Sequence, residues 1–127
     1  MDMSEDALQE AKRAISKLQK TVYWKPGKDI QHLKKRRALG HLPQDCQIKD
    51  YNKLISELVK GLENEVHLYE FGSQRYYMIR GKIKEKEWIV ILSMEGIIET
   101  AFPPKDIEGY LSKRNTTLLG KVGEIIK

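Results

Sequence analysis

Apolar positions in the first half of the chain recur at helical spacing. Residues 5–20 carry alanine, isoleucine and leucine at steps of three and four, which predicts an amphipathic helix. Residues 50–62 form a clearer apolar stripe and predict a helix that lies mainly in the core. Between these two segments, Asp29 is placed to cap a short basic helix over residues 29–38, which Gly40 ends. A helical N-terminal half is therefore expected.

The pattern changes after Asn64 to alternating positions rich in β-branched and aromatic residues. Short turns separate four such runs, which predict strands over residues 66–71, 75–81, 87–93 and 96–102. Short turns between consecutive strands are typical of hairpins, so we expect an antiparallel meander with the helices packed on one face. Residues 106–113 predict one more short helix.

This order of elements predicts an α+β fold, in which N-terminal helices pack on a four-stranded antiparallel sheet. A length of 127 residues suits a single domain with one hydrophobic core. Within this domain, residues 1–28 form a helical extension with a short extended piece at residues 22–24, and residues 29–113 form the core of the fold. Residues 114–127 are expected to be a tail that frays.

Composition excludes several classes of protein. A single cysteine, Cys46, cannot form an internal disulfide, and no Cys/His spacing suits zinc, so we expect a reducing, cytoplasmic setting with no metal and no cofactor. Nowhere do about eighteen apolar residues run together, so neither a membrane span nor a secretory signal is expected.

The net charge of +5 is unevenly distributed along the chain. Residues 1–11 carry four acids and no base, whereas residues 12–37 carry ten bases and one acid. A basic stretch this dense is typical of a protein that binds a polyanion, and nucleic acid is the commonest such partner. A solvated helix face is the alternative interpretation.

Two histidines, His32 and His41, flank the basic helix. Imidazole titrates near neutral pH, so such a pair can move protons, while neighbouring cations suit a phosphate. Cleaving RNA internally requires a base for the 2′-hydroxyl, an acid for the departing oxygen and cations for the phosphorane, and it requires no metal. Taken singly, each histidine is better explained by a structural role than by a catalytic one, as we expect for His67, but their clustering with cations favours a site.

Two polar residues stand out in the predicted sheet. Thr100 shares a strand face with Ile98 and Phe102, so its hydroxyl must find a hydrogen-bonding partner. Arg80 shares a strand face with Tyr76. Taken alone, its charge is explained if that face of the strand is exposed to solvent.

The order of these features resembles the barnase, EndoU and colicin-type ribonuclease superfamily, especially toxin domains of phage and bacterial conflict systems such as the tRNA-cleaving colicin D. The resemblance rests on the basic histidine segment, Gly40-His41-Leu42-Pro43, the apolar helix, Arg80, Trp88-Ile89-Val90-Ile91 and the run from Gly96 to Pro103. It implies a metal-independent endoribonuclease, with tRNA among its substrates, whose active site lies on the concave face of the sheet. It also implies 2′-hydroxyl attack and a cyclic phosphate product.

By the same resemblance, residues 29–113 are the nuclease core, His32 or, in competition, His41 supplies acid–base chemistry, and Arg80 and Thr100 complete a phosphate site. The cations expected to bind RNA are Lys28, Lys34, Lys35, Arg36 and Arg37. An acidic immunity or inhibitor protein is an expected partner. Two alternatives are a noncatalytic RNA- or DNA-binding module, which the same cations suit, and an interaction protein of a toxin system.

Overall fold

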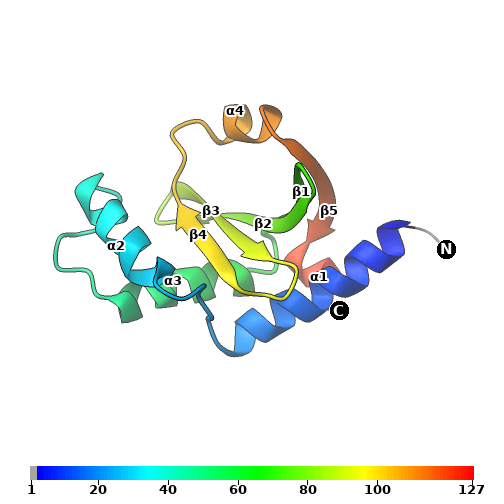
Figure 1. The fold of residues 1–127 in the computed structure, drawn as a ribbon, viewed down its shortest axis with the longest axis horizontal. Coiled ribbons are helices and arrows are strands. Elements are labelled where there is room, and N and C mark those ends of the chain that lie inside the picture. Colours follow the sequence, from blue (N-terminus) through cyan, green and yellow to red (C-terminus); the bar gives the residue numbers. More distant parts are fainter. Residues whose placement is uncertain (1–2) are drawn as a thin grey trace.

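The computed structural model describes residues 3–127, and its elements confirm the α+β class (Figure 1). Two long helices and a basic helix come first, a sheet follows, and two short helices lie near the C-terminus. In chain order the elements are α1 (Met3–Lys20), α2 (Lys28–Ala38), α3 (Ile48–Lys60), β1 (Glu65–Phe71), β2 (Gln74–Ile83), β3 (Lys86–Ser93), β4 (Ile98–Phe102), α4 (Ile107–Ser112), β5 (Asn115–Lys121) and α5 (Val122–Ile125).

The sheet is antiparallel with the strand order β4-β3-β2-β1-β5. The expected meander of the first four strands is confirmed, whereas the expectation of a four-stranded sheet with a frayed tail over residues 114–127 is wrong. β5 pairs with β1 from Glu70 opposite Asn115 to Glu65 opposite Lys121. Val122 and Ile125 in α5 are then buried in the main core, so the C-terminal segment completes the fold.

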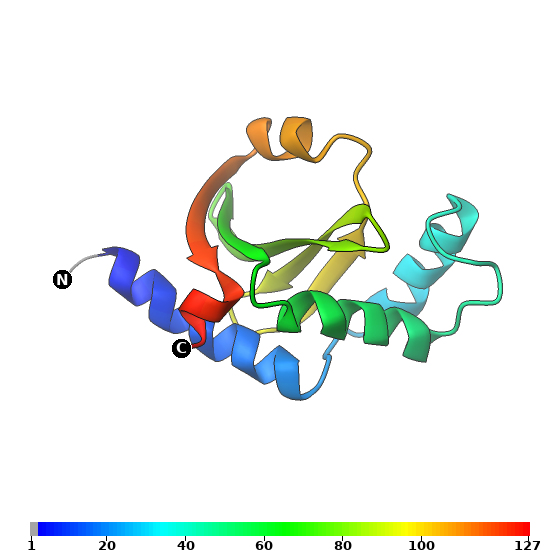
Figure 2. The ribbon, with the colours of Figure 1, turned by 180° about the vertical axis from the view of Figure 1, so that it is seen from behind.

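Helices α1 and α3 cover one face of the sheet, on which the main core forms (Figures 1 and 2). This face has apolar side chains at every second strand position, because alternate residues of a strand point to the same side. The buried residues that meet there include Val66, Leu68, Tyr77, Ile79, Val90 and Leu92 from the strands and Ile15, Leu18, Ile55, Leu58 and Val59 from the helices.

The opposite face is covered in part by α4, which lies across the curved sheet from α1 and α3 (Figure 1). Met78, Ile89 and Ile91 form a smaller buried cluster there with Ile107 and Leu111 of α4. This second face also carries the polar residues discussed below. No helix of residues 3–127 is long and apolar enough to cross a membrane.

A short extended segment connects α1 to α2 and fastens α2 to the edge of the sheet, as expected for residues 22–24. Trp24 forms a parallel bridge with Ile98 of β4. Backbone hydrogen bonds run from Ile98 N to Tyr23 O at 2.7 Å and from Lys25 N to Ile98 O at 3.2 Å. The helix that follows therefore begins next to β4.

The expected N-cap of α2 at Asp29 is wrong by two positions. The N-cap is Gly27 with φ of 82°, and the Asp29 carboxylate in the first turn accepts from Ile30 N instead. The positive φ favours glycine, which lets the chain turn sharply after Pro26. α3 begins at Ile48 rather than Asp50, because Gln47 and Asp50 form a reciprocal capping box.

We expect Ile125→Ala to lower the free energy of unfolding by about 2–5 kcal/mol, because it removes a buried side chain from the main core. Lys127→Ala, at an exposed position, is the matched control and should stay within about 0.5 kcal/mol of the parent. Urea unfolding followed by circular dichroism measures both variants. A frayed C-terminus would leave both as stable as the parent.

Candidate active site

Helix α2 divides its cations between the protein interior and solvent. His32 and Arg36 are four residues apart and therefore lie on one face of the helix, which is directed toward β4. Lys34 and Lys35 are exposed and Lys28 is half-buried. These three lysines were expected to bind RNA, and all three are at least partly accessible to solvent.

Arg36 is buried and Arg37 is half-buried, so neither of these two expected RNA-binding cations extends into solvent as Lys34 and Lys35 do. Arg36 is only 4% exposed. Arg37 donates from Nη2 to the carbonyl oxygen of Cys46 and so ties α2 to the loop before α3. The Arg37 guanidinium is thus part of the structure that supports the site.

His32 contacts Thr100, although 68 residues separate them in the sequence. His32 Nδ1 lies 3.2 Å from Thr100 Oγ1, so the threonine hydroxyl has the partner that its position requires. The imidazole is also stacked on Trp24, with ring centroids 5.9 Å apart. Burial, and then the charges of Arg36 and nearby lysines, lower the pKa of His32 below 6.5, so the ring is mostly neutral at pH 7.

Arg36 is a buried cation without a carboxylate partner among residues 6–127, whose side chains are described. Its Nη1 lies 3.2 Å from His41 Nδ1, its Cζ lies 5.6 Å from the centre of the Phe102 ring, and its Nε has no hydrogen-bonding partner. Removing an unpaired charge from water is costly. An anion that reached this guanidinium would recover part of that cost.

His41 follows the end of α2, where Gly40 has φ of 75° and turns the chain. An arginine can only donate, so His41 Nδ1 accepts from Arg36 and Nε2 carries the proton. Burial lowers the pKa of His41, as do the charges of Arg36, Lys86 and Lys105. His41 is therefore a neutral ring with its Nε2–H free of the Arg36 contact.

Two surface cavities meet at His41. One has a volume of about 540 Å³ and lies against α3, and the other has a volume of about 500 Å³ and lies against the loop between β4 and α4. Lys86 lines both cavities, and Lys105 lines the second. His41 thus lines both cavities, whereas His32 lies outside them at a half-buried position.

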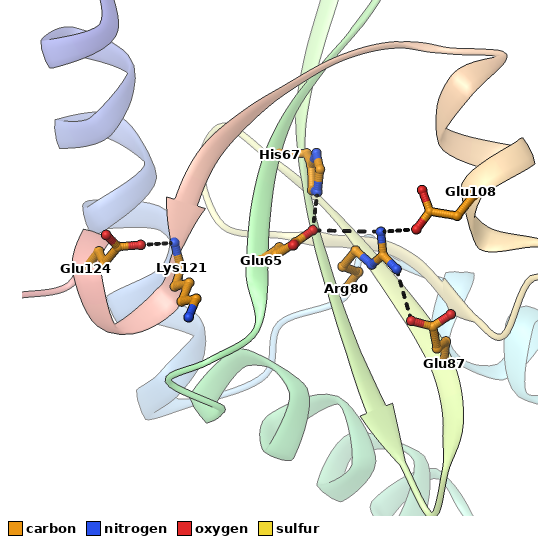
Figure 3. Close-up of polar contacts among 7 residues, drawn as sticks. All are labelled: Glu65, His67, Arg80, Glu87, Glu108, Lys121 and Glu124. Atoms are coloured by element: carbon orange, nitrogen blue, oxygen red, sulfur yellow. Dashed lines mark hydrogen bonds and ion pairs between the residues drawn. The ribbon is translucent and has the colours of Figure 1, made fainter.

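Arg80 belongs to a separate cluster of ion pairs (Figure 3). Its guanidinium lies 2.9 Å from Glu108, 3.0 Å from Glu87 and 3.8 Å from Glu65. Three carboxylates already compensate its charge, which argues against the phosphate-binding role expected of it. His67 in the same cluster donates from Nε2 to Glu65 at 3.1 Å, in keeping with the structural role expected of it.

Four residues of the site were not predicted from the sequence: Trp24, Phe102, Lys86 and Lys105. The two aromatic rings support His32 and Arg36, and the two lysines lie beside His41. Of these four, only Phe102 could have been found from the sequence, because it lies two residues after Thr100 in the predicted strand and so shares its face. Among the described residues, no group of three His, Cys, Asp or Glu side chains could hold a metal ion.

The lowered pKa of His32 predicts a pH dependence of stability. Below pH 6.5 the unfolded chain takes up this proton before the folded protein does, so the free energy of unfolding falls as the pH falls toward the folded pKa. The stability that the neutral His32 ring contributes is complete above pH 6.5. It is lost as the pH falls from 6.5 to the lower pKa of the folded protein. Urea titrations between about pH 5 and pH 8 should show a smaller fall in His32→Gln than in the parent. An equal fall of the unfolding free energy in His32→Gln and in the parent would contradict the lowered pKa of His32.

Comparison with family models, with curated proteins and with solved structures returns no match to this chain.

Proposed function

We propose that this protein is a metal-independent endoribonuclease whose site lies where α2 meets β4. The observation that carries the proposal is the buried Arg36 guanidinium, which has no carboxylate partner among the described residues and lies between two neutral histidines. A phosphodiester supplies the missing negative charge. The neutral histidines supply the proton chemistry that cleavage of RNA requires.

In this proposal His32 is the general base. The mechanism requires the tautomer in which His32 Nδ1–H donates to Thr100 Oγ1, because the lone pair on Nε2 can then accept the proton of a ribose 2′-hydroxyl. Stacking on Trp24 fixes the plane of the ring. The low pKa of His32 keeps the ring unprotonated at neutral pH and therefore ready to accept a proton.

Arg36 and His41 stabilise the negative charge that develops on the oxygens bonded to phosphorus. The 2′-oxygen forms a bond to phosphorus, the bond from phosphorus to the 5′-oxygen breaks, and the 5′-oxygen leaves with a proton from water. The phosphorane between these steps carries extra negative charge, which prearranged donors stabilise. The Arg36 guanidinium and the Nε2–H of His41 are such donors. The product is a 2′,3′-cyclic phosphate.

The exposed lysines of α2 attract the RNA. Lys34 and Lys35 point to solvent and form no ion pair among the described side chains. Such cations raise affinity in a sequence-independent and salt-dependent way. They also suit a noncatalytic RNA-binding protein, so only measurements of turnover separate the two functions.

We expect cleavage of total tRNA or of a single-stranded RNA to continue in excess EDTA, because every group in the proposed mechanism is a side chain or water. Mapping the fragment ends should give 2′,3′-cyclic phosphates at the 5′ side of each cut. Cleavage that appears only after magnesium or manganese is added, or 3′-hydroxyl ends, would show that the mechanism is wrong.

We expect His32→Ala to lower the cleavage rate by about a hundredfold to ten-thousandfold, as loss of a general base does. His41→Ala should lower it by about a hundredfold to a thousandfold, as loss of one transition-state donor does. RNA affinity and melting temperature should stay close to those of the parent, since the lysines remain. His67→Gln is the matched control and should cleave normally. Parent-level turnover in both alanine variants would show that neither histidine takes part in cleavage and would rule out this mechanism.

A further inference from the structure

Three cavities are linked in a row by the residues that line more than one of them. The α3 cavity lies between α3 and the turn joining β2 to β3, the central cavity lies beside the end of α2, and the α4 cavity of about 410 Å³ lies along α4. His41 and Lys86 line both the α3 cavity and the central cavity. Pro104 and Lys105 line both the central cavity and the α4 cavity. Each neighbouring pair therefore shares a wall.

Each cavity combines an apolar surface with cations. Leu54 and Trp88 line the α3 cavity, and Phe102 and Tyr110 line the α4 cavity. Proteins that hold single-stranded nucleic acid use this combination, because each base presents an apolar face and each phosphate a negative charge. The cations that line the row are Lys53, Lys84, Lys86, Lys105, Lys113 and Arg114.

The α4 cavity contains an ordered planar cation. Arg114 Cζ lies 3.4 Å from the centre of the Tyr110 ring, and Arg114 Nη1 donates to the Tyr110 carbonyl oxygen at 2.9 Å. A guanidinium plane fixed in this way is a surface on which an unpaired RNA base can stack. A fixed side chain also loses little conformational freedom when the base binds.

Acidic side chains also line the row, and most of them already have partners in the fold. Asp50 accepts from Gln47 N, Asp106 accepts from Gly109 N, and Glu87 pairs with Arg80. The other two acidic residues of the row are Glu57 and Glu85. None of the five lysines of the row forms an ion pair among the described side chains. With the charge of Glu87 compensated by Arg80, six cations face four carboxylates along the row, so the row carries a small net positive charge.

We propose that the three cavities are consecutive nucleotide subsites for single-stranded RNA. The inference rests on the proposed function for one point: the cleaved phosphate lies at the wall formed by His41 and Lys86, between the α3 cavity and the central cavity. One nucleotide then lies on one side of the cut and two lie on the other. Base-paired RNA does not fit, because its bases are not free to enter the cavities.

The first experiment measures binding alone, with 2′-O-methyl oligonucleotides that lack the attacking hydroxyl. Fluorescence anisotropy at fixed salt should show affinity rising with each nucleotide up to three and more slowly beyond that length. A duplex of the same sequence should bind at least about tenfold more weakly than the single strand. Equal affinity for single strand and duplex would overturn the inference, whether or not the protein cleaves RNA.

Variants locate the binding on the row. Arg114→Ala should weaken binding of the trinucleotide about fivefold to a hundredfold, which corresponds to loss of one stacked base. Lys113→Ala removes a cation from the same cavity and should reduce the salt dependence of binding. Lys60→Ala, an exposed lysine that lines none of the three cavities, is the matched control and should bind like the parent. Unchanged affinity in folded Arg114→Ala and Lys113→Ala proteins would overturn the inference.

The second experiment tests the position of the cut. Single abasic replacements along a cleavable RNA should slow cleavage at one position on one side of the cut and at two positions on the other. A symmetrical pattern, or no effect at any position, would contradict the assignment of the subsites. If the parent cleaves no RNA, the proposed function fails, and the binding experiment alone decides whether the row holds single strands.

Discussion

The attachment of α2 to the edge of the sheet is the constraint on which the candidate site depends. Backbone hydrogen bonds between the Tyr23–Lys25 segment and Ile98 fix the point at which the chain enters α2. From that point, the spacing of a helical turn brings His32 to Thr100 and Arg36 to Phe102. Because β4 is an edge strand, its unpaired side accepts this segment without disturbing the meander.

Two arginines near the second face of the sheet show contrasting electrostatics. Arg80 is surrounded by three glutamates, one of them on α4, so its ion pairs join that helix to the strands (Figure 3). Arg36 is more deeply buried, yet its contacts are an imidazole and an aromatic ring. Arg80 therefore has its counter-charges within the fold, whereas Arg36 is suited to an anion supplied from outside.

Local patterns in the sequence predicted the helices and the meander, because alternation and helical spacing are local properties of the chain. β5 was missed, since its run of two threonines and two leucines is short and is bounded by Gly120 and Lys121. It forms because β1 presents a free edge. The sequence did hold a signal for the inward position of Arg36. Arg36 follows the apolar Leu33 by three residues, so the two lie on the same face of α2, and both are buried. The contacts of His32 with Thr100 depend on tertiary structure and could not be predicted from spacing.

The strand order has a consequence for how the protein folds as it is synthesised. The first four strands pair with their neighbours in sequence, so their hairpins require only short loops to close. β1 keeps one edge unpaired until residues 115–121 have been made, and that edge is open to wrong pairing during this interval. The histidine site at the other edge is formed from α2 and β4, which are made earlier. The elements of the site are thus synthesised before the strand that completes the sheet.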